Sequence, residues 1–438
     1  MLQHRVAHGT NVASRSRRQN HRRVATAAPP TPMASSSRGI DTTVVAAAAS
    51  SSPSSSSPSL LVIGATGVTG RAALDGLIAA GVTPANILAV TRSAAGQGAR
   101  AVAERGVGIA EGDLDSGGGD NGDVARLLAA YPTLRAVYVH ALSADAAKAD
   151  PRELERAERL AAQLSAACEK GGSGNGGRLD LVLYNSSAGR GSGAGISQMD
   201  QKHAAEDVLR QGGPAGDSSS SPSTAPRYPF LALQPAMFYE ELWKRYTRPS
   251  VLSKGKFPFS VPPDVPVHLV AARDLGTAVA VALRDPQRYA AMRALPLAGD
   301  ALTPAQLCSA FEKAAREWTN EQQQQQSSST PSDVATTVTQ SRPPAWLFWL
   351  LNRDLYRIVR FLSSPPGYGV DVGQARAAVP GLLTFEHFLR ATGWADPSRS
   401  YEDGVRYDDV DVPGSAGGGS PVPVGTNAAA GSAAAAAE

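Results

Sequence analysis

The chain has 438 residues, of which 42% are hydrophobic and 18% are charged, and its formal net charge is +3. This length exceeds what one compact domain usually needs, so a large folded body with additional segments is expected. Residues 1–59 hold seven arginines and a single acid, a net charge of +6, which leaves −3 for the remainder. A body with net negative charge does not favour nucleic-acid binding.

The amino-terminal segment 1–59 is rich in arginine, serine and alanine and almost free of acids. This composition is typical of an organelle transit peptide, and it lacks the apolar stretch of a secretory signal. We therefore expect a transit peptide and disordered linker over 1–59, with the chloroplast as destination and the mitochondrion as the alternative. A disordered basic tail is the simpler interpretation of the same composition.

The first predicted element is a buried strand, Leu60–Ile63, which leads directly into spaced glycines and a helix over 71–80. Glycines in this arrangement permit a tight turn, a close approach to a pyrophosphate and close helix packing. The free amides and dipole at the helix start favour bound phosphate, whereas a purely structural turn is the alternative. The predicted cofactor contacts here are Gly64, Ala65, Thr66, Gly67, Val68, Thr69 and Gly70.

Strands and helices then alternate along the chain, which indicates right-handed crossovers and a parallel sheet covered on both faces. The predicted fold class is α/β, a doubly wound parallel sheet of the Rossmann type with a small carboxy-terminal substrate lobe. Helices are expected over 151–170 and 198–211. Further strands are predicted at 86–91, 106–110, 134–140, 179–184 and 228–233.

Low-complexity segments set the expected domain boundaries, because they cannot bury enough apolar surface to offset the entropy of ordering. The Rossmann domain is expected over 60–235, with an insertion at 212–226. The substrate lobe is expected over 236–400, with a disordered insertion at 319–344 and helices that return to the Rossmann core. A low-complexity tail is expected over 401–438.

The end of the second strand indicates which nicotinamide cofactor is bound. An NAD site usually places an acid there, but residues 81–103 contain none, and the strand ends Thr91-Arg92-Ser93. A guanidinium and hydroxyls suit a 2′-phosphate, so NADP(H) is the predicted cofactor, with Arg100 as a weaker candidate. After the third strand, Asp113 and Leu114 are placed near the adenine edge, where Asp113 accepts from the adenine amino group or caps the next helix.

Taken in order, several motifs resemble the NmrA-like family of atypical short-chain dehydrogenase/reductases over about residues 60–315. They are GATGVTGR at 64–71, VTRS at 90–93, EGDLD at 111–115, QKHAAEDVLR at 201–210, LQPAMFYEEL at 233–242 and ARDLG at 272–276. The resemblance implies an NADP(H)-binding Rossmann domain with a small lobe that closes a cleft. Family members include NADPH-dependent reductases of quinones and related molecules, and others that sense the redox state of the cofactor through partner proteins.

The catalytic dyad of ordinary short-chain dehydrogenases is incomplete in this sequence. Lys202 matches the lysine position, but Gln198 stands where the proton-donating tyrosine is expected, and an amide is no general acid. In the related isoflavone-reductase-like enzymes a lysine of this helix is the proposed acid/base, so Lys202 is the candidate catalytic residue, with Ser187 after the fifth strand as a weaker one. A surface ion pair between Lys202 and Glu206 is the alternative.

Other polar and aromatic positions are predicted to be structural. Tyr184 is expected in the core, His140 as a hydrogen-bonded spacer, His203 in solvent or packed, and Asp274 as a helix N-cap. Phe238 and Tyr239 either wall the nicotinamide pocket or belong to the core.

The segment 345–362 is predicted to be an amphipathic helix that packs over the cleft or contacts a membrane or partner peripherally. No apolar run is long enough for a transmembrane segment. The spacing of Cys168 and Cys308 predicts neither a disulfide framework nor a metal site.

The function predicted from these features is an NADPH-dependent reductase of a small quinone or conjugated carbonyl. The alternative is a non-catalytic NADP(H) redox sensor or assembly factor that acts through a regulatory protein partner.

Overall fold

The computed structural model describes residues 57–117, 119–143, 149–169, 179–212, 227–244, 246–325, 334–401 and 405–407. Residues 1–56 of the predicted transit peptide and linker, residues 213–226 of the predicted insertion and the tail after residue 407 therefore lie outside the described residues.

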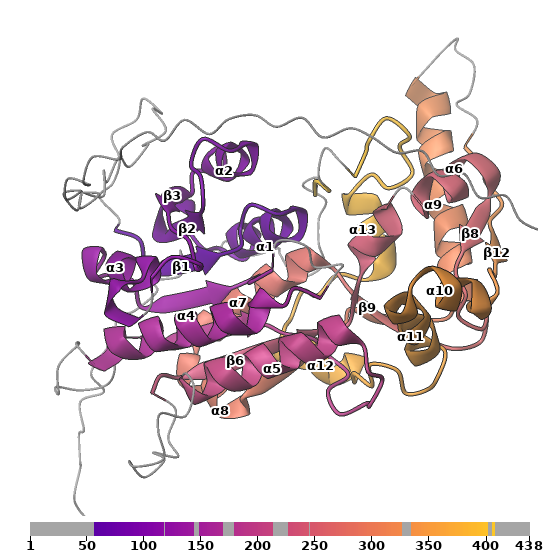
Figure 1. The fold of residues 1–438 in the computed structure, drawn as a ribbon. Coiled ribbons are helices and arrows are strands. Elements are labelled where there is room, and N and C mark those ends of the chain that lie inside the picture. Colours follow the sequence, from indigo (N-terminus) through magenta and orange to yellow (C-terminus); the bar gives the residue numbers. More distant parts are fainter. Residues whose placement is uncertain are drawn as a thin grey trace, which may run out of the picture. The chain divides into compact units, whose positions relative to one another are not determined.

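A seven-stranded parallel sheet is the centre of the fold (Figure 1). Its strand order is β10-β6-β5-β4-β1-β2-β3, with parallel pairing throughout. The predicted doubly wound α/β class is thus confirmed; only β10, the edge strand, had no sequence-based prediction. The strands are β1 (Leu60–Ile63), β2 (Ile87–Thr91), β3 (Gly108–Glu111), β4 (Ala136–Val139), β5 (Leu181–Asn185), β6 (Phe230–Pro235) and β10 (Ala294–Leu297).

Both faces of this sheet are apolar and each is covered by helices. In β1, Leu60 and Val62 belong to one buried cluster and Leu61 and Ile63 to the other, as the alternation of side chains along a strand requires. One face carries α1 (Val68–Ala79), α2 (Gln97–Ala103), α7 (Ala272–Arg284), α8 (Pro286–Met292) and α12 (Val372–Ala378). The other carries α3 (Asp123–Ala130), α4 (Arg152–Glu169) and α5 (Ser197–Gln211).

Helices α1 and α7 approach each other unusually closely at two glycines. A Cβ atom on Gly76 would lie 1.9 Å from the carbonyl oxygen of Arg273, and one on Gly276 would lie 1.9 Å from that of Ala73. Since no side chain fits in such gaps, the absence of a Cβ on both helices is what allows the backbones to touch. This contact packs the carboxy-terminal half of α1 against a helix from the second half of the chain.

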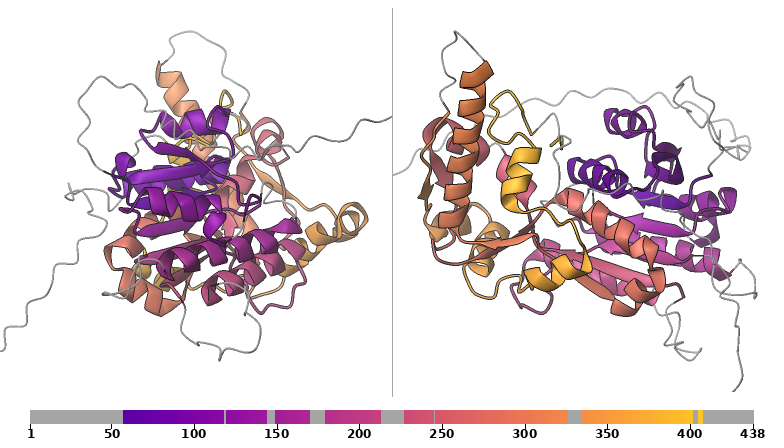
Figure 2. Two further views of the ribbon diagram at one scale, coloured as in Figure 1. Left: turned by 60° about the vertical axis from the view of Figure 1, so that its left-hand side comes forward. Right: turned by 180° about the vertical axis from the view of Figure 1, so that it is seen from behind.

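The remaining elements form a second lobe with its own apolar core (Figure 2). Its largest fully buried side chains are aromatic, and Phe311 stacks on Trp394 with ring centroids 4.4 Å apart. Its strands are β7 (Met237–Phe238), β9 (Val267–Val270) and β11 (Asp300–Leu302) in one small sheet, and β8 (Lys256–Pro258) and β12 (Thr339–Ser341) in another. Its helices are α6 (Arg248–Lys254), α9 (Pro304–Gln325), α10 (Ala345–Leu351), α11 (Arg353–Leu362) and α13 (Phe385–Ala391).

The predicted disordered insertion 319–344 is partly ordered instead. Helix α9 continues to Gln325, and residues 339–341 form β12 against β8. Glutamine has a good helix propensity, so the Gln run extends a helix that is already nucleated by the apolar positions before it. The carboxylate of Glu312 on α9 accepts a hydrogen bond from the amide of Val338 at 2.8 Å, which holds the returning chain.

The segment 345–362 is two helices rather than the single helix that the sequence predicts. Asn352 has an extended backbone, and its side chain caps α11 by accepting from the amides of Asp354 and Leu355 at 2.8 and 3.2 Å. The predicted core packing is wrong for α10, since Trp346 is 64% and Trp349 54% exposed. Among the described residues, no helix has the length and apolarity that crossing a bilayer requires.

Candidate functional site

The turn between β1 and α1 is a tight backbone cradle. Gly64 has φ +86°, a backbone conformation that residues other than glycine rarely adopt. A Cβ atom on it would lie 2.7 Å from the amide nitrogen of Ala141. A Cβ on Gly70 would lie 2.3 Å from the carbonyl oxygen of Gly64. Two of the three predicted glycines are therefore required by the fold itself.

The third glycine, Gly67, has a different environment. It is the N-cap of α1 with an ordinary φ of −72°, and a Cβ on it would meet nothing within 4 Å. No side chain caps this helix start, so the first amides of α1 have no capping partner among the described residues. The fold itself does not need a glycine here. A glycine at this position would instead leave room for a pyrophosphate to approach the backbone amides.

This cradle lies where the chain order of the sheet reverses. Strand β1 is flanked by β2 on one side and by β4 on the other, so the β1–α1 turn lies at the topological switch point. In open α/β sheets, ligands bind outside the carboxyl ends of the strands at this point. The structure therefore places residues 64–70, with the uncapped amides that begin α1, at the point of the sheet where such folds bind ligands.

The next strand along the sheet brings a guanidinium to the same edge. Arg92 directly follows β2 and is exposed, as is Ser93. Within the described part of the chain, no hydrogen bond or ion pair holds the Arg92 side chain, so its five donors are available to a phosphate.

Asp113 and Leu114 follow β3, one strand further out. The carboxylate of Asp113 accepts the amide of Asp115 at 3.0 Å, which forms a local turn. It does not cap the next helix: Gly122 is the N-cap of α3, and Asp123 accepts the amide of Asp113 at 2.8 Å. The capping alternative is therefore wrong, because the intervening loop separates Asp113 from the helix start.

Beyond the cradle on the β4 side, Lys202 belongs to a buried polar cluster. Its Nζ atom lies 3.4 Å from Oε1 of Glu153 on α4, whose side chain is 3% exposed. The Tyr184 hydroxyl donates to the same Oε1 at 3.3 Å. The alternative of a surface pair with Glu206 is wrong, because Glu206 is buried and is paired with Arg190 and Arg210 instead.

His140 connects this cluster to the glycine turn. It follows β4, with Nε2 2.9 Å from the Thr69 hydroxyl and Nδ1 2.8 Å from the Tyr138 hydroxyl. Burial, aided by the nearby charge of Lys202, lowers the pKa of His140 to about 3, so the ring is neutral near pH 7. The spacer role predicted for His140 is confirmed, and the position of Tyr184 in the core is confirmed as well.

The other predicted catalytic residue, Ser187, lies just after β5 and before α5 begins at Ser197. Ser187 is half-buried and its hydroxyl donates to the carbonyl oxygen of Ala188 at 3.2 Å, while His203 bonds to the Ser187 carbonyl oxygen at 2.9 Å. Gln198 lies in the first turn of the helix that carries Lys202.

Two predictions in the second half of the chain have clear outcomes. Asp274 is not a helix N-cap, since α7 begins after Ala271; Asp274 is buried in the first turn and its Oδ2 accepts the amide of Leu383 at 3.0 Å. Burial raises the pKa of Asp274 to about 7.

Tyr239 is a core residue against Phe385, whereas Phe238 is half-buried.

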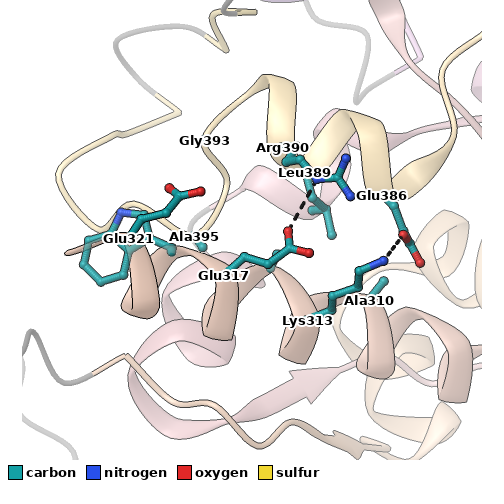
Figure 3. Close-up of a pocket in the computed structure, with 11 residues that line it drawn as sticks. Ala310, Lys313, Glu317, Glu321, Glu386, Leu389, Arg390, Gly393 and Ala395 are labelled. Atoms are coloured by element: carbon teal, nitrogen blue, oxygen red, sulfur yellow. Dashed lines mark hydrogen bonds and ion pairs between the residues drawn. The ribbon is translucent and has the colours of Figure 1, made fainter. Parts of the chain in front are cut away.

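A surface hollow between α9 and α13 lies outside this region (Figure 3). Two ion pairs span it, from Lys313 to Glu386 at 2.5 Å and from Arg390 to Glu317 at 3.4 Å. None of its lining residues belongs to the parallel sheet or to the glycine turn. Within the described ranges, no cluster of three or more histidine, cysteine, aspartate or glutamate side chains could hold a metal ion.

Glu153 is the site residue that sequence reasoning missed. Its only signal is that it lies on the buried face of α4, in line with Ala157 and Leu160, where a carboxylate is unexpected. The partner of that carboxylate cannot be identified from spacing, because Lys202 is 49 positions away.

Comparisons with known proteins agree with this geometry. A model described as the NmrA-like family matches residues 224–336, which confirms the predicted resemblance over that segment. No curated protein matches the sequence.

Solved structures share the fold at low sequence identity. A nucleoside-diphosphate-sugar epimerase from Staphylococcus aureus aligns with a TM-score of 0.52 at 12% identity, over 76% of this chain and 99% of that one. An NADPH-dependent quinone oxidoreductase from Escherichia coli gives 0.50 at 17%, over 75% and 97%. A Citrobacter triphenylmethane reductase complexed with NADP(H) gives 0.51 at 15%, over 75% and 97%.

Proposed function

We propose that this chain, which matches the NmrA-like family over residues 224–336, is an NADPH-dependent reductase of a small quinone or conjugated carbonyl. The observation that carries the proposal is Gly67: it caps α1 at the switch point of the sheet, with uncapped amides and open space before it. Two structurally similar proteins are an NADPH-dependent quinone oxidoreductase and a reductase complexed with NADP(H), which supports the same cofactor and reaction type.

The residues present fit NADP(H) from one end to the other. The amides of residues 67–70 would hold the diphosphate, and the hydroxyl of Thr69, fixed by His140, borders the same turn. Arg92 would pair with the 2′-phosphate, since a planar guanidinium binds phosphate oxygens in a bidentate manner. Asp113 and Leu114, which follow β3, would contact the adenine.

NADPH supplies a hydride when it is bound. What the chain adds is the positive charge of Lys202. This charge is close enough to His140 to lower the pKa of that ring, and it is paired with the carboxylate of Glu153. An ammonium in this position stabilises negative charge on the oxygen of an acceptor and can return a proton to it. Because no tyrosine precedes Lys202 by four residues, an acceptor that tolerates anionic charge, such as a quinone or enone, suits the site better than a simple ketone.

A direct experiment is to incubate the full chain with NADPH and a panel of quinones and enones and to follow NADPH absorbance. We expect turnover that Lys202→Met lowers by about 100-fold, the usual contribution of a positioned acid or charge. Lys254→Met, an exposed lysine at the end of α6, is the matched control and should leave turnover unchanged. Oxidation that is equally fast in both variants would contradict the role of Lys202.

Gln198 supports a second candidate function, a non-catalytic NADP(H) redox sensor that acts through a protein partner. With an amide at the usual acid position, the site can bind the cofactor without reducing anything. Tight binding of NADPH, measured by calorimetry, together with no oxidation by any acceptor in the panel would favour this function. Absence of binding would contradict both.

A further inference from the structure

An unusual group of side chains lies on α10 and α11, away from the candidate site. Six large hydrophobic side chains are exposed among the described residues, and four of them fall between positions 346 and 355. They are Trp346 (64%), Trp349 (54%), Leu350 (67%) and Leu355 (39%). Soluble surfaces rarely gather apolar side chains in this way unless the surface binds something.

The same segment is strongly basic. Residues 342–362 contain Arg342, Arg353, Arg357 and Arg360, all exposed, and one acid, Asp354. The segment therefore has a net charge of +3, whereas residues 60–438 together have −3. We call residues 342–362 the basic aromatic segment.

One side of this segment packs against the rest of the protein. The segment is therefore docked on the fold, and its exposed side chains are not core residues that have come loose. Phe361 and Leu362 are buried, and the Phe361 ring abuts Gly189 and Met199. The hydroxyl of Ser197 donates to Asp354 at 3.2 Å. Helix α10 lies beside α11 (Figure 1), and its two tryptophans are exposed.

We propose that the basic aromatic segment docks on an anionic lipid surface. Tryptophan is favoured at the level of lipid headgroups, where its ring is apolar and its N–H is hydrated, and arginines near it attract anionic lipids. The segment consists of two short consecutive helices that carry both apolar side chains and arginines. Helices of this kind can lie in the plane of the membrane–water interface. The rest of residues 60–438 has a net charge of −6, so the positive charge is concentrated in this segment, which favours an anionic surface as its partner.

The proposal can be tested with the full chain and sedimenting vesicles. One set is pure phosphatidylcholine and the other also contains phosphatidylglycerol. We expect binding to the anionic set that added salt weakens, because exposed charges are screened. Equal partition into both sets would overturn the proposal of an anionic surface.

Residues 1–59 are also basic, so variants within the segment decide the outcome. The double variant Arg353→Gln/Arg360→Gln should bind about 25-fold more weakly, at about fivefold for each arginine. Trp346→Ala/Trp349→Ala should lose about tenfold, through apolar area that no longer enters the interface. Matched controls lie on α8: Arg288→Gln and Met292→Ala remove an exposed arginine and an exposed apolar side chain there and should have no effect.

Three further results would overturn the proposal. They are no sedimentation with either vesicle, an equal loss of binding in the segment variants and the α8 controls, and unchanged binding in the segment variants. Urea unfolding of every variant shows that the fold is intact, since all six positions are exposed. Sedimentation velocity without lipid tests the main competing occupant. If wild type is a dimer and the tryptophan variant a monomer, the face is a contact between copies of this chain, and the lipid proposal fails.

Discussion

The ammonium of Lys202 and the carboxylate of Glu153 lie 3.4 Å apart, on two neighbouring helices of the same face of the sheet. Their side chains are 17% and 3% exposed, so solvent screens the pair only weakly. Glu153 also accepts the hydroxyl of Tyr184. Glu153 thus links the ammonium of Lys202 on α5 to the Tyr184 hydroxyl on β5.

Breaking this pair should affect both stability and catalysis. We expect Glu153→Gln to lower the free energy of unfolding by roughly 1–3 kcal/mol, because a buried ammonium and a buried hydroxyl lose their charged partner. A double-mutant cycle with Lys202→Met, followed by urea unfolding, should give a coupling of about 1 kcal/mol or more. Strictly additive effects would mean that the two groups do not interact.

Arg92 should determine the preference between the two nicotinamide cofactors. Arg92→Ala is expected to weaken NADPH binding by roughly 10- to 100-fold, the value of one charge-assisted contact, and to leave NADH binding nearly unchanged. Calorimetry with both cofactors measures this directly. Arg288→Ala on α8 removes an exposed arginine that has no predicted cofactor role and serves as the control. Equal NADPH affinity before and after the Arg92 change would refute the assignment.

Gly67 and Gly70 should respond in opposite ways to alanine. Gly67→Ala meets open space, so the free energy of unfolding should change by less than about 1 kcal/mol, while NADPH affinity falls at least about tenfold. Gly70→Ala places a Cβ against the backbone of Gly64 and should destabilise the fold by more than about 2 kcal/mol. Urea unfolding and calorimetry of both variants separate these effects. A Gly67→Ala protein with full affinity would argue against a diphosphate in this turn.

The α1–α7 contact predicts a large effect far from the site. Gly276→Ala should destabilise by roughly 2–4 kcal/mol, since its Cβ would overlap the carbonyl oxygen of Ala73 and push the helices apart. Gly96→Ala is a suitable control, because a Cβ there meets its nearest neighbour at 3.4 Å. Thermal unfolding measures both. Similar stabilities for the two variants would contradict the contact.

Asp274 should make stability depend on pH. Burial raises its pKa to about 7, above the ordinary value of 3.8, so the folded state holds a proton that the unfolded state releases between these values. This contribution is fully present below about pH 4 and is lost as the pH rises through about 7. Relative to wild type, Asp274→Asn should therefore gain stability as the pH increases over this range, in urea unfolding at several pH values. Parallel curves would contradict a raised pKa.

The sequence by itself determined the features that neighbouring residues encode. The strand Leu60–Ile63, the glycine turn after it, the alternation of strands and helices, and the position of Lys202 near the start of α5 all follow from local backbone demands and apolar patterning. The break at Asn352 could not be predicted in this way. Residues 345–362 are amphipathic throughout, but Asn352 caps α11 and so divides the segment into two helices.

Only the tertiary structure decided which distant residues meet. The strand order places α4 beside α5, which gives Lys202 the carboxylate of Glu153 rather than that of Glu206, and the same packing buries Asp274 and presses Gly76 toward α7. It also left the tryptophans of α10 exposed, although their composition suits a core equally well. Burial and pairing are properties of three-dimensional neighbours, and spacing along one chain carries no information about neighbours that the sheet brings together.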